Sequence, residues 1–529
     1  MRLVLSALIA CVLAIPCLAS PQVNTATASP ATKTYKLAGV VVNPVSGEPI
    51  RRALVLLQGP TQYSAFTGQD GRFEIENVPE GSYVPTVQKP SFFQPNMLDP
   101  QNVRVNQISV SASAKPVTLE LVPAATITGR VTDSNGQPVQ NASVQCFSEQ
   151  VINGRKRWQP GNAAVTDEDG TYEIENLAPG QYKIRLLQGH PSDFTGVASV
   201  AARLPQRAYR TQYFPDASDA QSAQSFQLRP GERMQADFKV TPVPAFRVSG
   251  SAGPIATFAF GNIQDVGGDD VGNGIAVNPQ TGKWTASALP SGTWKIVVHT
   301  QGPSGESPYY GERSVEVADS DVQNVAVPLQ PLASVPVRIA NSTESTAQNV
   351  QIRLMPHGFR PNDPEYGASA SASQGSASIT GVLPGTYSVV AQAWGEGCVD
   401  SISSGGIDLT RDDLTVALGS QPAPIDVVLR TDCATLNVNL TRSDEAAPVA
   451  VVVVSGNRSF EPRLINFNGS NAKIPNLTPG DYRIFAFSSA AGLEYANPEA
   501  LRDYTGQEIT LAPNQQVEVS INIIERGGN

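Results

Sequence analysis

Histidine and cysteine are scarce in this chain of 529 residues, and the shortage restricts its chemistry. The 3 histidines, His190, His299 and His357, lie far apart in the sequence. A zinc peptidase needs several such ligands that converge with a carboxylate. A Gly-x-Ser-x-Gly nucleophile elbow and a glycine-rich phosphate loop are also missing. We therefore predict that the protein is not an enzyme and has neither a cofactor nor a metal centre.

Two acidic segments, residues 167–170 and 265–270, carry the oxygen ligands that calcium prefers. Neither has the spacing of a dedicated calcium loop. We interpret the first as a β-turn that leads into a strand. At the second, calcium remains an alternative because the glycines there would let backbone carbonyls converge.

Positive charge is in the minority: 37 basic residues against 47 acidic ones give a formal charge of −10. Binding of nucleic acid without sequence preference needs a basic field, so we expect no nucleic-acid partner. Arg155, Lys156 and Arg157 form the only compact basic cluster in a loop. We interpret this cluster as the solvated tip of a hairpin rather than a phosphate site.

The longest apolar stretch lies at the start of the chain. Arg2, the apolar residues 3–15 and a small-x-small site that ends at Ala19 predict a secretory signal peptide over residues 1–19. A lipoprotein signal at Cys11 is an alternative. No later stretch is long enough for a membrane-spanning helix, so we expect no transmembrane segment after cleavage. The mature protein is expected to be secreted, periplasmic or on the outer cell envelope.

The sequence is rich instead in turn residues, with 44 glycines and 42 prolines, and one corner recurs along it. Each copy is an alternating apolar and polar run, then a Pro-Gly or similar turn, then an aromatic two residues on. In the second copy Tyr172 and Ile174 share one face of a strand, a period that a helix would not bury. Pro179-Gly180 predicts a tight corner in which the glycine takes a positive φ. The copies occupy residues 71–83, 170–182, 282–294, 375–387 and 470–482.

The corners divide the chain into units of about 90 to 120 residues, the size of a β-sandwich domain. We predict an all-β protein, a tandem array of about five Greek-key β-sandwiches of immunoglobulin-like or prealbumin-like type. After the signal peptide and a polar linker over residues 20–34, the units span residues 35–122, 123–243, 244–333, 334–432 and 433–529.

The first two units share a further pattern, a hairpin rich in glycine, asparagine and proline at residues 37–55 and 127–144. Together with the corner, this hairpin resembles the carboxypeptidase regulatory-like domain, a transthyretin-like sandwich that also belongs to the carbohydrate-binding-like folds. Units three to five keep the corner without the hairpin. The corner itself resembles the tyrosine corner of Greek-key sandwiches, in which a buried aromatic hydroxyl bonds to the backbone. The peptidase domain that accompanies such domains in some enzymes is missing here.

Cleavage of the signal peptide leaves Cys146, Cys398 and Cys433, and three thiols cannot all pair within one chain. Cys398 and Cys433 flank the junction of units four and five and are the best candidates for a disulfide, which an export compartment would permit. We interpret Cys146, in a strand of unit two, as a small buried hydrophobic residue.

Two functions fit this organisation. The resemblance implies carbohydrate binding, so that the partner is a polysaccharide or another glycan. The alternative is a structural or adhesive spacer array that contacts other envelope proteins through sheet edges or loop ends. Sugars stack on exposed aromatic rings beside polar groups, and unit two has the longest insertions. The predicted ligand-binding residues are therefore Trp158, Arg155, Arg157, Tyr209, Tyr213 and Phe214.

The remaining aromatics divide into two groups. Trp284 and Trp294 occupy the strand and corner positions of unit three, which predicts core packing. For Tyr309, Tyr310 and Trp394, exposed contact and loop anchor remain open alternatives. The apolar run over residues 446–454 is expected to be buried within unit five, since an exposed edge of this kind would pair with another chain.

Overall fold

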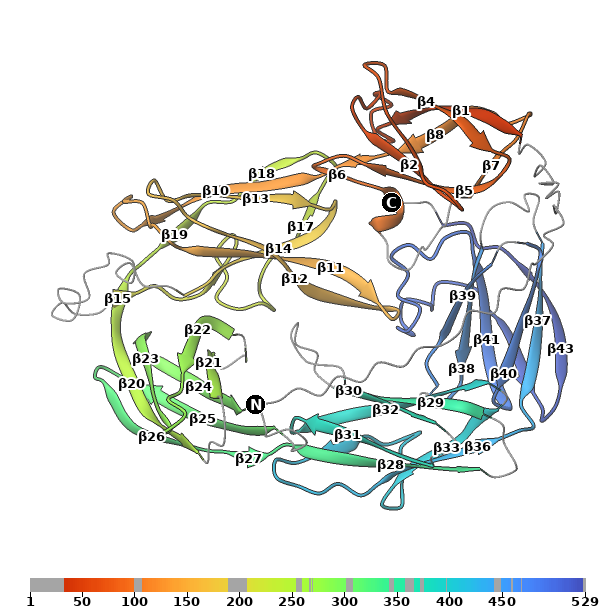
Figure 1. The fold of residues 1–529 in the computed structure, drawn as a ribbon. Coiled ribbons are helices and arrows are strands. Elements are labelled where there is room, and N and C mark those ends of the chain that lie inside the picture. The colour runs from red at the N-terminus through yellow and green to blue at the C-terminus, as the bar shows by residue number, and fades with distance from the viewer. Residues whose placement is uncertain are drawn as a thin grey trace, which may run out of the picture.

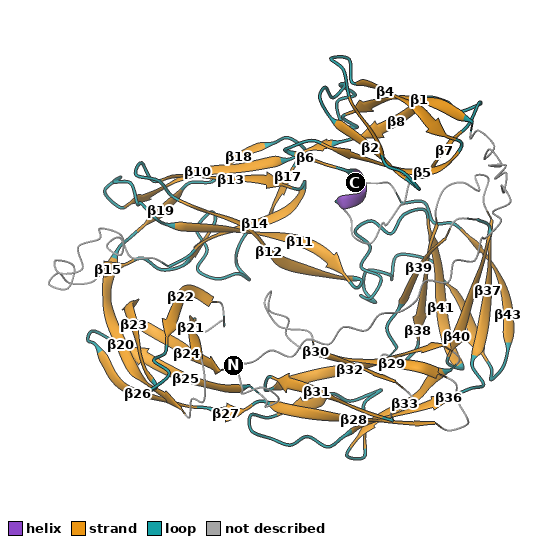
Figure 2. Ribbon diagram, viewed as in Figure 1, coloured by secondary structure: helices purple, strands orange, loops and turns teal. Residues whose placement is uncertain are grey.

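The computed structural model shows a chain built almost entirely of β-strands (Figure 1; Figure 2). The predicted signal peptide, residues 1–19, and most of the predicted linker lie outside the described residues. So do His190 and His357. The structure describes residues 33–98, 107–188, 207–253, 259–265, 268, 270–300, 308–341, 347–356, 366–371, 375–395, 397–441, 449–457, 460–467 and 469–526.

Unit one consists of two facing sheets, ordered β4-β1-β8 and β3-β2-β5-β7. Its core combines apolar residues from both sheets, with Leu57 and Val41 fully buried. The elements are β1 (Thr34–Val42), β2 (Leu54–Gln58), β3 (Tyr63–Phe66), β4 (Arg72–Pro79), β5 (Gly81–Gln88), β6 (Phe92–Phe93), the 3-10 helix η1 (Pro95–Met97), β7 (Ile108–Val110) and β8 (Val117–Glu120).

Unit two repeats this arrangement, with β13-β10-β18 facing β12-β11-β14-β16. The alternation on β13 buries Tyr172, Ile174 and Leu177 and exposes the residues between, which confirms the period-two interpretation. The strands are β9 (Val122–Pro123), β10 (Ala125–Asp133), β11 (Ser143–Ile152), β12 (Arg155–Val165), β13 (Thr171–Leu177), β14 (Gly180–Leu186), β15 (Arg207–Ala208), β16 (Gln212–Tyr213), β17 (Phe226–Leu228), β18 (Arg233–Gln235) and β19 (Phe238–Val240).

Unit three places a sheet containing β20, β23 and β26 against the sheet β22-β21-β24-β25-β27. Trp284 and Trp294 are 2% and 5% exposed, so both belong to the core as predicted. The strands are β20 (Val243–Gly253), β21 (Ala259–Gln264), β22 (Asp270–Ala276), β23 (Lys283–Pro290), β24 (Gly292–Thr300), β25 (Tyr309–Val317), β26 (Val322–Pro328) and β27 (Gln330–Pro331).

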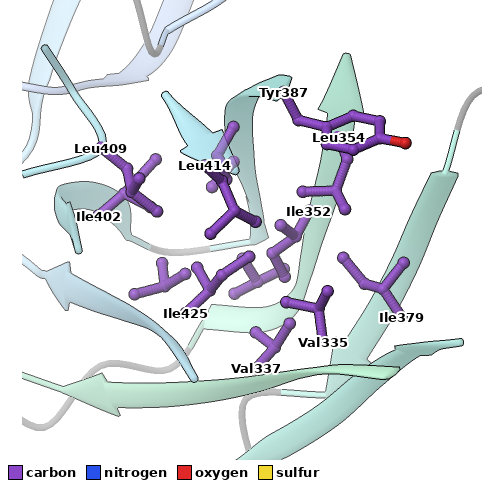
Figure 3. Close-up of a cluster of buried hydrophobic side chains, with 14 of the residues drawn as sticks. Val335, Val337, Ile352, Leu354, Ile379, Tyr387, Ile402, Leu409, Leu414 and Ile425 are labelled. Carbon is purple, nitrogen blue, oxygen red and sulfur yellow. The ribbon is translucent and has the colours of Figure 1, made fainter. Parts of the chain in front are cut away.

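Unit four packs the sheet β31-β28-β36-β33-β34 on the sheet β30-β29-β32-β35. Figure 3 shows how Val337 and Ile425 from one sheet meet Ile352 and Leu354 from the other in a core that also takes up Tyr387. The strands are β28 (Ala333–Asn341), β29 (Ala347–Pro356), β30 (Tyr366–Ser371), β31 (Ser376–Val382), β32 (Gly385–Gly395), β33 (Cys398–Ser404), β34 (Ile407–Asp408), β35 (Leu414–Val416) and β36 (Ile425–Arg430).

Unit five faces β40-β37-β43 with β39-β38-β41-β42. The described part of the apolar run, β38, is paired on both sides and buried from Val449 to Val453, as expected. Residues 446–448 lie outside the described residues. The strands are β37 (Ala434–Thr441), β38 (Val449–Ser455), β39 (Arg463–Phe467), β40 (Asn471–Leu477), β41 (Gly480–Phe487), β42 (Gln507–Leu511) and β43 (Gln516–Asn522).

The same topology therefore recurs in every unit. The first long strand pairs antiparallel with the strand before the corner and parallel with a late strand, as β1 does with β4 and β8. Strands β10, β20, β28 and β37 repeat the pattern. Units three to five thus share the fold of units one and two although they lack the early hairpin sequence.

The repeated corner has one hydrogen-bond geometry throughout. Its aromatic side chain donates to the carbonyl four residues earlier, and in unit three a tryptophan indole N–H takes the place of the tyrosine hydroxyl. The resemblance to a tyrosine corner is therefore confirmed. The bonds are Tyr83 to Pro79 (3.1 Å), Tyr182 to Ala178 (2.7 Å), Trp294 to Pro290 (2.8 Å), Tyr387 to Leu383 (2.8 Å) and Tyr482 to Thr478 (2.6 Å).

The corner glycines Gly180, Gly292 and Gly480 have φ values of 158°, 150° and 152°, so the predicted positive φ at the corner glycine is confirmed in these three copies. A second positive-φ position lies just before the corner. Asn77, Asn176 and Asn476 have φ values of 57°, 58° and 59°, in the left-handed region. The asparagines stand where the pairing register shifts, and asparagine tolerates this conformation better than most residues.

Units two to five follow one another around a common centre (Figure 1). Each junction has its own contacts: β6 pairs with β9 between units one and two, and β15 pairs with β20 between units two and three. Between units three and four, Tyr310 and Leu332 are buried beside Leu383. The disulfide Cys398–Cys433 joins units four and five, so the predicted pairing is confirmed.

Candidate functional site

The aromatics predicted to bind a ligand in unit two do not form an exposed patch. Tyr209 and Tyr213 are each 2% exposed, and Phe214 packs edge-to-face on Phe226 and Phe238. The reason is that β16 pairs with β14 and folds the insertion back over the end of the sandwich. The expectation that these rings are available for stacking is therefore wrong.

Trp158 and the arginines beside it are also engaged within the protein. The ammonium group of Lys183 lies 4.9 Å from the centre of a Trp158 ring, and Arg157 is 9% exposed. Arg155 stands at the end of β12 that contacts unit five, where the Gly154 carbonyl accepts a hydrogen bond from Ala496. The interpretation of this hairpin as a solvated tip is therefore wrong.

Trp394, which sequence reasoning left undecided, is the one strongly exposed tryptophan among the 4 in the chain, at 53%. Tyr310 is 7% exposed and serves as an anchor between units three and four. Trp394 lies near the end of β32, where period-two alternation places it on the face opposite the buried Ala391 and Ala393. The surroundings of the Trp394 ring depend on unit five, which lies beside the end of β32.

A cleft of about 500 Å³ separates β32 of unit four from β39 and β40 of unit five. Its volume lies within the range of small-ligand sites. Trp394 and Gln392 line one wall, and Lys473 and Asn476 line the other. The apolar floor and walls include Val390, Ala393, Val453, Phe460, Leu464, Ile465, Ile474, Leu477 and Tyr482.

The two walls are fixed relative to one another. Besides the disulfide, the Thr478 hydroxyl donates to the Val399 carbonyl at 2.8 Å, and Arg353 of unit four pairs with Glu461 of unit five. Phe460 inserts its ring against the unit four core. Several independent contacts therefore set the width of the cleft, which reduces the ordering cost of binding.

The polar groups of the cleft include one with unused hydrogen-bonding capacity. One carboxylate oxygen of Glu461 accepts from Arg353, and the other is buried without a hydrogen-bond partner. Arg463 donates to the carbonyls of Pro475 and Asn476 at 3.2 and 3.1 Å, and burial lowers the pKa of its guanidinium. The cleft thus offers an exposed indole and an exposed ammonium, groups that a polyhydroxylated ligand can stack on and bond to.

The acidic turns behave as local structure where they are described. The Asp167 carboxylate accepts from the Thr171 hydroxyl at 2.6 Å and the Thr171 amide at 2.8 Å, and these bonds lower its pKa. The β-turn interpretation is confirmed. In the second segment, residues 266, 267 and 269 lie outside the described residues, and Asp270 accepts from Asn262.

Within the described ranges, no group of three or more histidine, cysteine, aspartate or glutamate residues is placed to hold a metal ion. No helix in the described part of the chain is long and apolar enough to cross a membrane.

Residues 36–115 and 126–241 match the carboxypeptidase regulatory-like domain family. No curated protein sequence matches the chain. Among solved structures, a streptococcal ancillary pilin is 13% identical over 56% of this chain and 100% of its own, with a TM-score of 0.19. The minor pilin GBS52 of Streptococcus agalactiae is 13% identical over 40% and 97%, with a TM-score of 0.21. The Bacillus anthracis TIE protein is 10% identical over 95% and 76%, with a TM-score of 0.16.

Proposed function

We propose that this chain, whose first two units are carboxypeptidase regulatory-like domains, is a non-catalytic protein of the cell exterior that binds a glycan in the cleft between units four and five. The observation that carries the proposal is the position of Trp394, 53% exposed on the wall of a cleft with a fixed width. An indole with one open face is the usual platform for the apolar face of a sugar ring.

The groups around the indole match the second requirement of sugar recognition, which is hydrogen bonding to hydroxyls. Lys473 and Gln392, which line the cleft, can donate to a sugar hydroxyl. The cleft is therefore suited to a saccharide that stacks on Trp394 and bonds to these two side chains.

A disulfide at this junction agrees with a protein of an oxidising compartment. The bond links β33, whose first residues Cys398 and Val399 line the cleft, to the residue just before β37 in unit five. The disulfide that export permits thus helps to fix the geometry of the proposed binding site and to stabilise the junction of units four and five.

The test is a glycan array probed with the purified mature chain and with the variants Trp394→Ala and Trp158→Ala. Trp158 is the matched control because its ring is partly buried and already covered by Lys183. We expect saturable binding that weakens by about tenfold or more in Trp394→Ala, from loss of ring stacking and burial, and that persists in Trp158→Ala.

Two results would contradict the proposal. Absence of binding to every saccharide by a folded chain would favour the alternative, a structural or adhesive array that contacts other envelope proteins. Loss of binding in Trp158→Ala with retention in Trp394→Ala would move the ligand site back to unit two.

A further inference from the structure

The β11–β12 hairpin of unit two extends beyond the sandwich to which it belongs. Its two strands remain paired from Ser143 and Val165 to Ile152 and Arg155. The tip is an Asn153-Gly154 turn with φ values of 49° and 73°, the conformation that ends a tight hairpin. The hairpin is therefore a paired projection with one register shift, between Gln145 and Phe147, rather than an irregular loop.

The tip contacts unit five through backbone, charge and packing together. The Ala496 amide donates to the Gly154 carbonyl at 2.9 Å, and the Lys156 ammonium lies 3.4 Å from the Glu494 carboxylate. A Cβ atom on Gly154 would stand 2.7 Å from both the Ala496 nitrogen and the Tyr495 ring. The contact thus requires glycine for its close approach as well as for its φ value.

The receiving surface in unit five is held in place by its own packing. Within the loop over residues 488–504, Leu493 and Leu501 are buried with Phe487 in a small cluster, against which Tyr495 packs. Arg526 donates to the carbonyls of two residues of this loop. The hairpin therefore contacts a preformed surface, which lowers the ordering cost of the contact.

Charges from three units meet beside this contact. Burial, together with the nearby Glu461 carboxylate, raises the pKa of Tyr495, while Arg155 of unit two and Arg353 of unit four act in the opposite direction. The basic residues of the hairpin thus face the acidic residues of unit five. This arrangement gives Arg155 and Lys156 a role that their sequence alone did not indicate.

We propose that the β11–β12 hairpin is an intramolecular latch, which binds residues 494–496 of unit five and closes units two to five into a ring. The whole lengths of units three and four separate the two partners along the chain, yet the hairpin tip reaches unit five across the centre of the array (Figure 1). Because the tip is held at the surface of unit five by an ion pair, a backbone hydrogen bond and the contact with Tyr495, the latch can open without unfolding any unit. The ring and the opened array are the two states of the protein.

Zero-length carbodiimide cross-linking of the full mature chain tests the latch, since it joins an amine to a carboxylate only when they are in contact. We expect a cross-link between Lys156 and Glu494 in the monomer fraction, identified by mass spectrometry of the digest. Lys156 also lies 3.8 Å from Glu149 on the same hairpin, and this second cross-link is an internal reference for hairpin folding and reagent efficiency.

The decisive variants are Gly154→Ala and its control Gly136→Ala. Both glycines lie in unit two turns, with φ values of 73° and 80°, but a Cβ on Gly136 meets nothing within 4 Å. We expect Gly154→Ala to lower the Lys156 to Glu494 yield by about fivefold or more through overpacking, with the Lys156 to Glu149 yield unchanged. Gly136→Ala keeps both yields, and only Gly154→Ala increases the maximum dimension in small-angle scattering.

Three results would overturn the latch. One is a wild-type monomer that forms the reference cross-link without the Lys156 to Glu494 cross-link. Another is an equal Lys156 to Glu494 yield in Gly154→Ala and Gly136→Ala. The third is a cross-link that, in a mixture of isotopically light and heavy chains, occurs only between different copies.

Discussion

Removal of the Tyr182 hydroxyl, in the variant Tyr182→Phe, tests whether the repeated corner stabilises each unit through its hydrogen bond. The hydroxyl donates to the Ala178 carbonyl at 2.7 Å, and the side chain is 4% exposed. The ring remains in place, so the packing of the core is preserved. The change therefore isolates one hydrogen bond and leaves its carbonyl acceptor partly buried without that donor.

The size of the effect follows from this geometry. A buried neutral hydrogen bond contributes about 0.5–1.5 kcal/mol, and an acceptor left without a partner raises the cost, so we expect the free energy of unfolding of unit two to fall by about 1–2 kcal/mol. For a domain of this size that corresponds to a decrease in Tm of roughly 4 to 10 °C. The other units, which keep their own corners, should be unaffected.

The matched control is Tyr209→Phe. Tyr209 belongs to the same core and is 2% exposed, but its hydroxyl has no hydrogen-bond partner among the described residues. We expect Tyr209→Phe to change the stability of unit two by less than about 0.5 kcal/mol. Both variants thus remove the same atom from the same core, and only one of them removes a hydrogen bond.

Calorimetry of the full chain, combined with hydrogen exchange of unit two peptides, provides the measurement. Exchange assigns the change to a unit, which calorimetry of a multidomain protein does not do by itself. If Tyr182→Phe and Tyr209→Phe lowered the protection of β14 equally, the corner hydrogen bond would not be the stabilising element. A decrease confined to units other than two would also refute the reasoning.

Three further predictions concern thiols and tyrosines. Cys146 is fully buried, and burial raises its pKa to about 11. A thiol reagent at pH 8 should therefore label no cysteine in the folded mature chain and one cysteine after unfolding. Labelling of the folded chain would contradict the burial of Cys146. Replacing Cys398 and Cys433 by serine should lower the free energy of unfolding at the junction of units four and five by about 3–4 kcal/mol for a loop of 35 residues, measured by urea unfolding, and an unchanged midpoint would contradict this. Burial raises the pKa values of Tyr172 and Tyr182 above the usual value, so the folded state holds protons that the unfolded chain releases. This contribution to stability should be complete below about pH 10 and decline above it. Ultraviolet titration of the folded protein should show neither residue ionising near pH 10.

The class of fold and the number of units were predictable because local chemistry repeats. The alternation around Tyr172 and Ile174 selects a strand with one buried face, and a Pro-Gly turn ends it, whatever the rest of the chain does. The left-handed asparagines were not predicted, because Asn176 and Asn476 act through a register shift that exists only once two strands pair.

The predicted exposure of the unit two aromatics was wrong for a related reason. Tyr209 and Tyr213 stand in a long insertion, which suggested exposure, but strand pairing returns the insertion to the core of its own sandwich. Trp394 stands on the face of β32 opposite the buried Ala391 and Ala393, and alternation within one strand does not say what this face meets. The second wall of its cleft comes from unit five, and the residue pattern within unit four carries no information about a neighbouring unit.

The sequence by itself determined the all-β class, the repeated sandwich and the buried corner aromatics, since these depend on strand period and turn chemistry. Only the tertiary structure determined which surfaces remain exposed to solvent. Exposure of Trp394 and burial of the Gly154 turn both depend on how separate units meet, and contacts between units combine residues far apart in the chain. No local sequence pattern encodes these contacts between units, because the same hairpin or strand would fold identically beside a different unit.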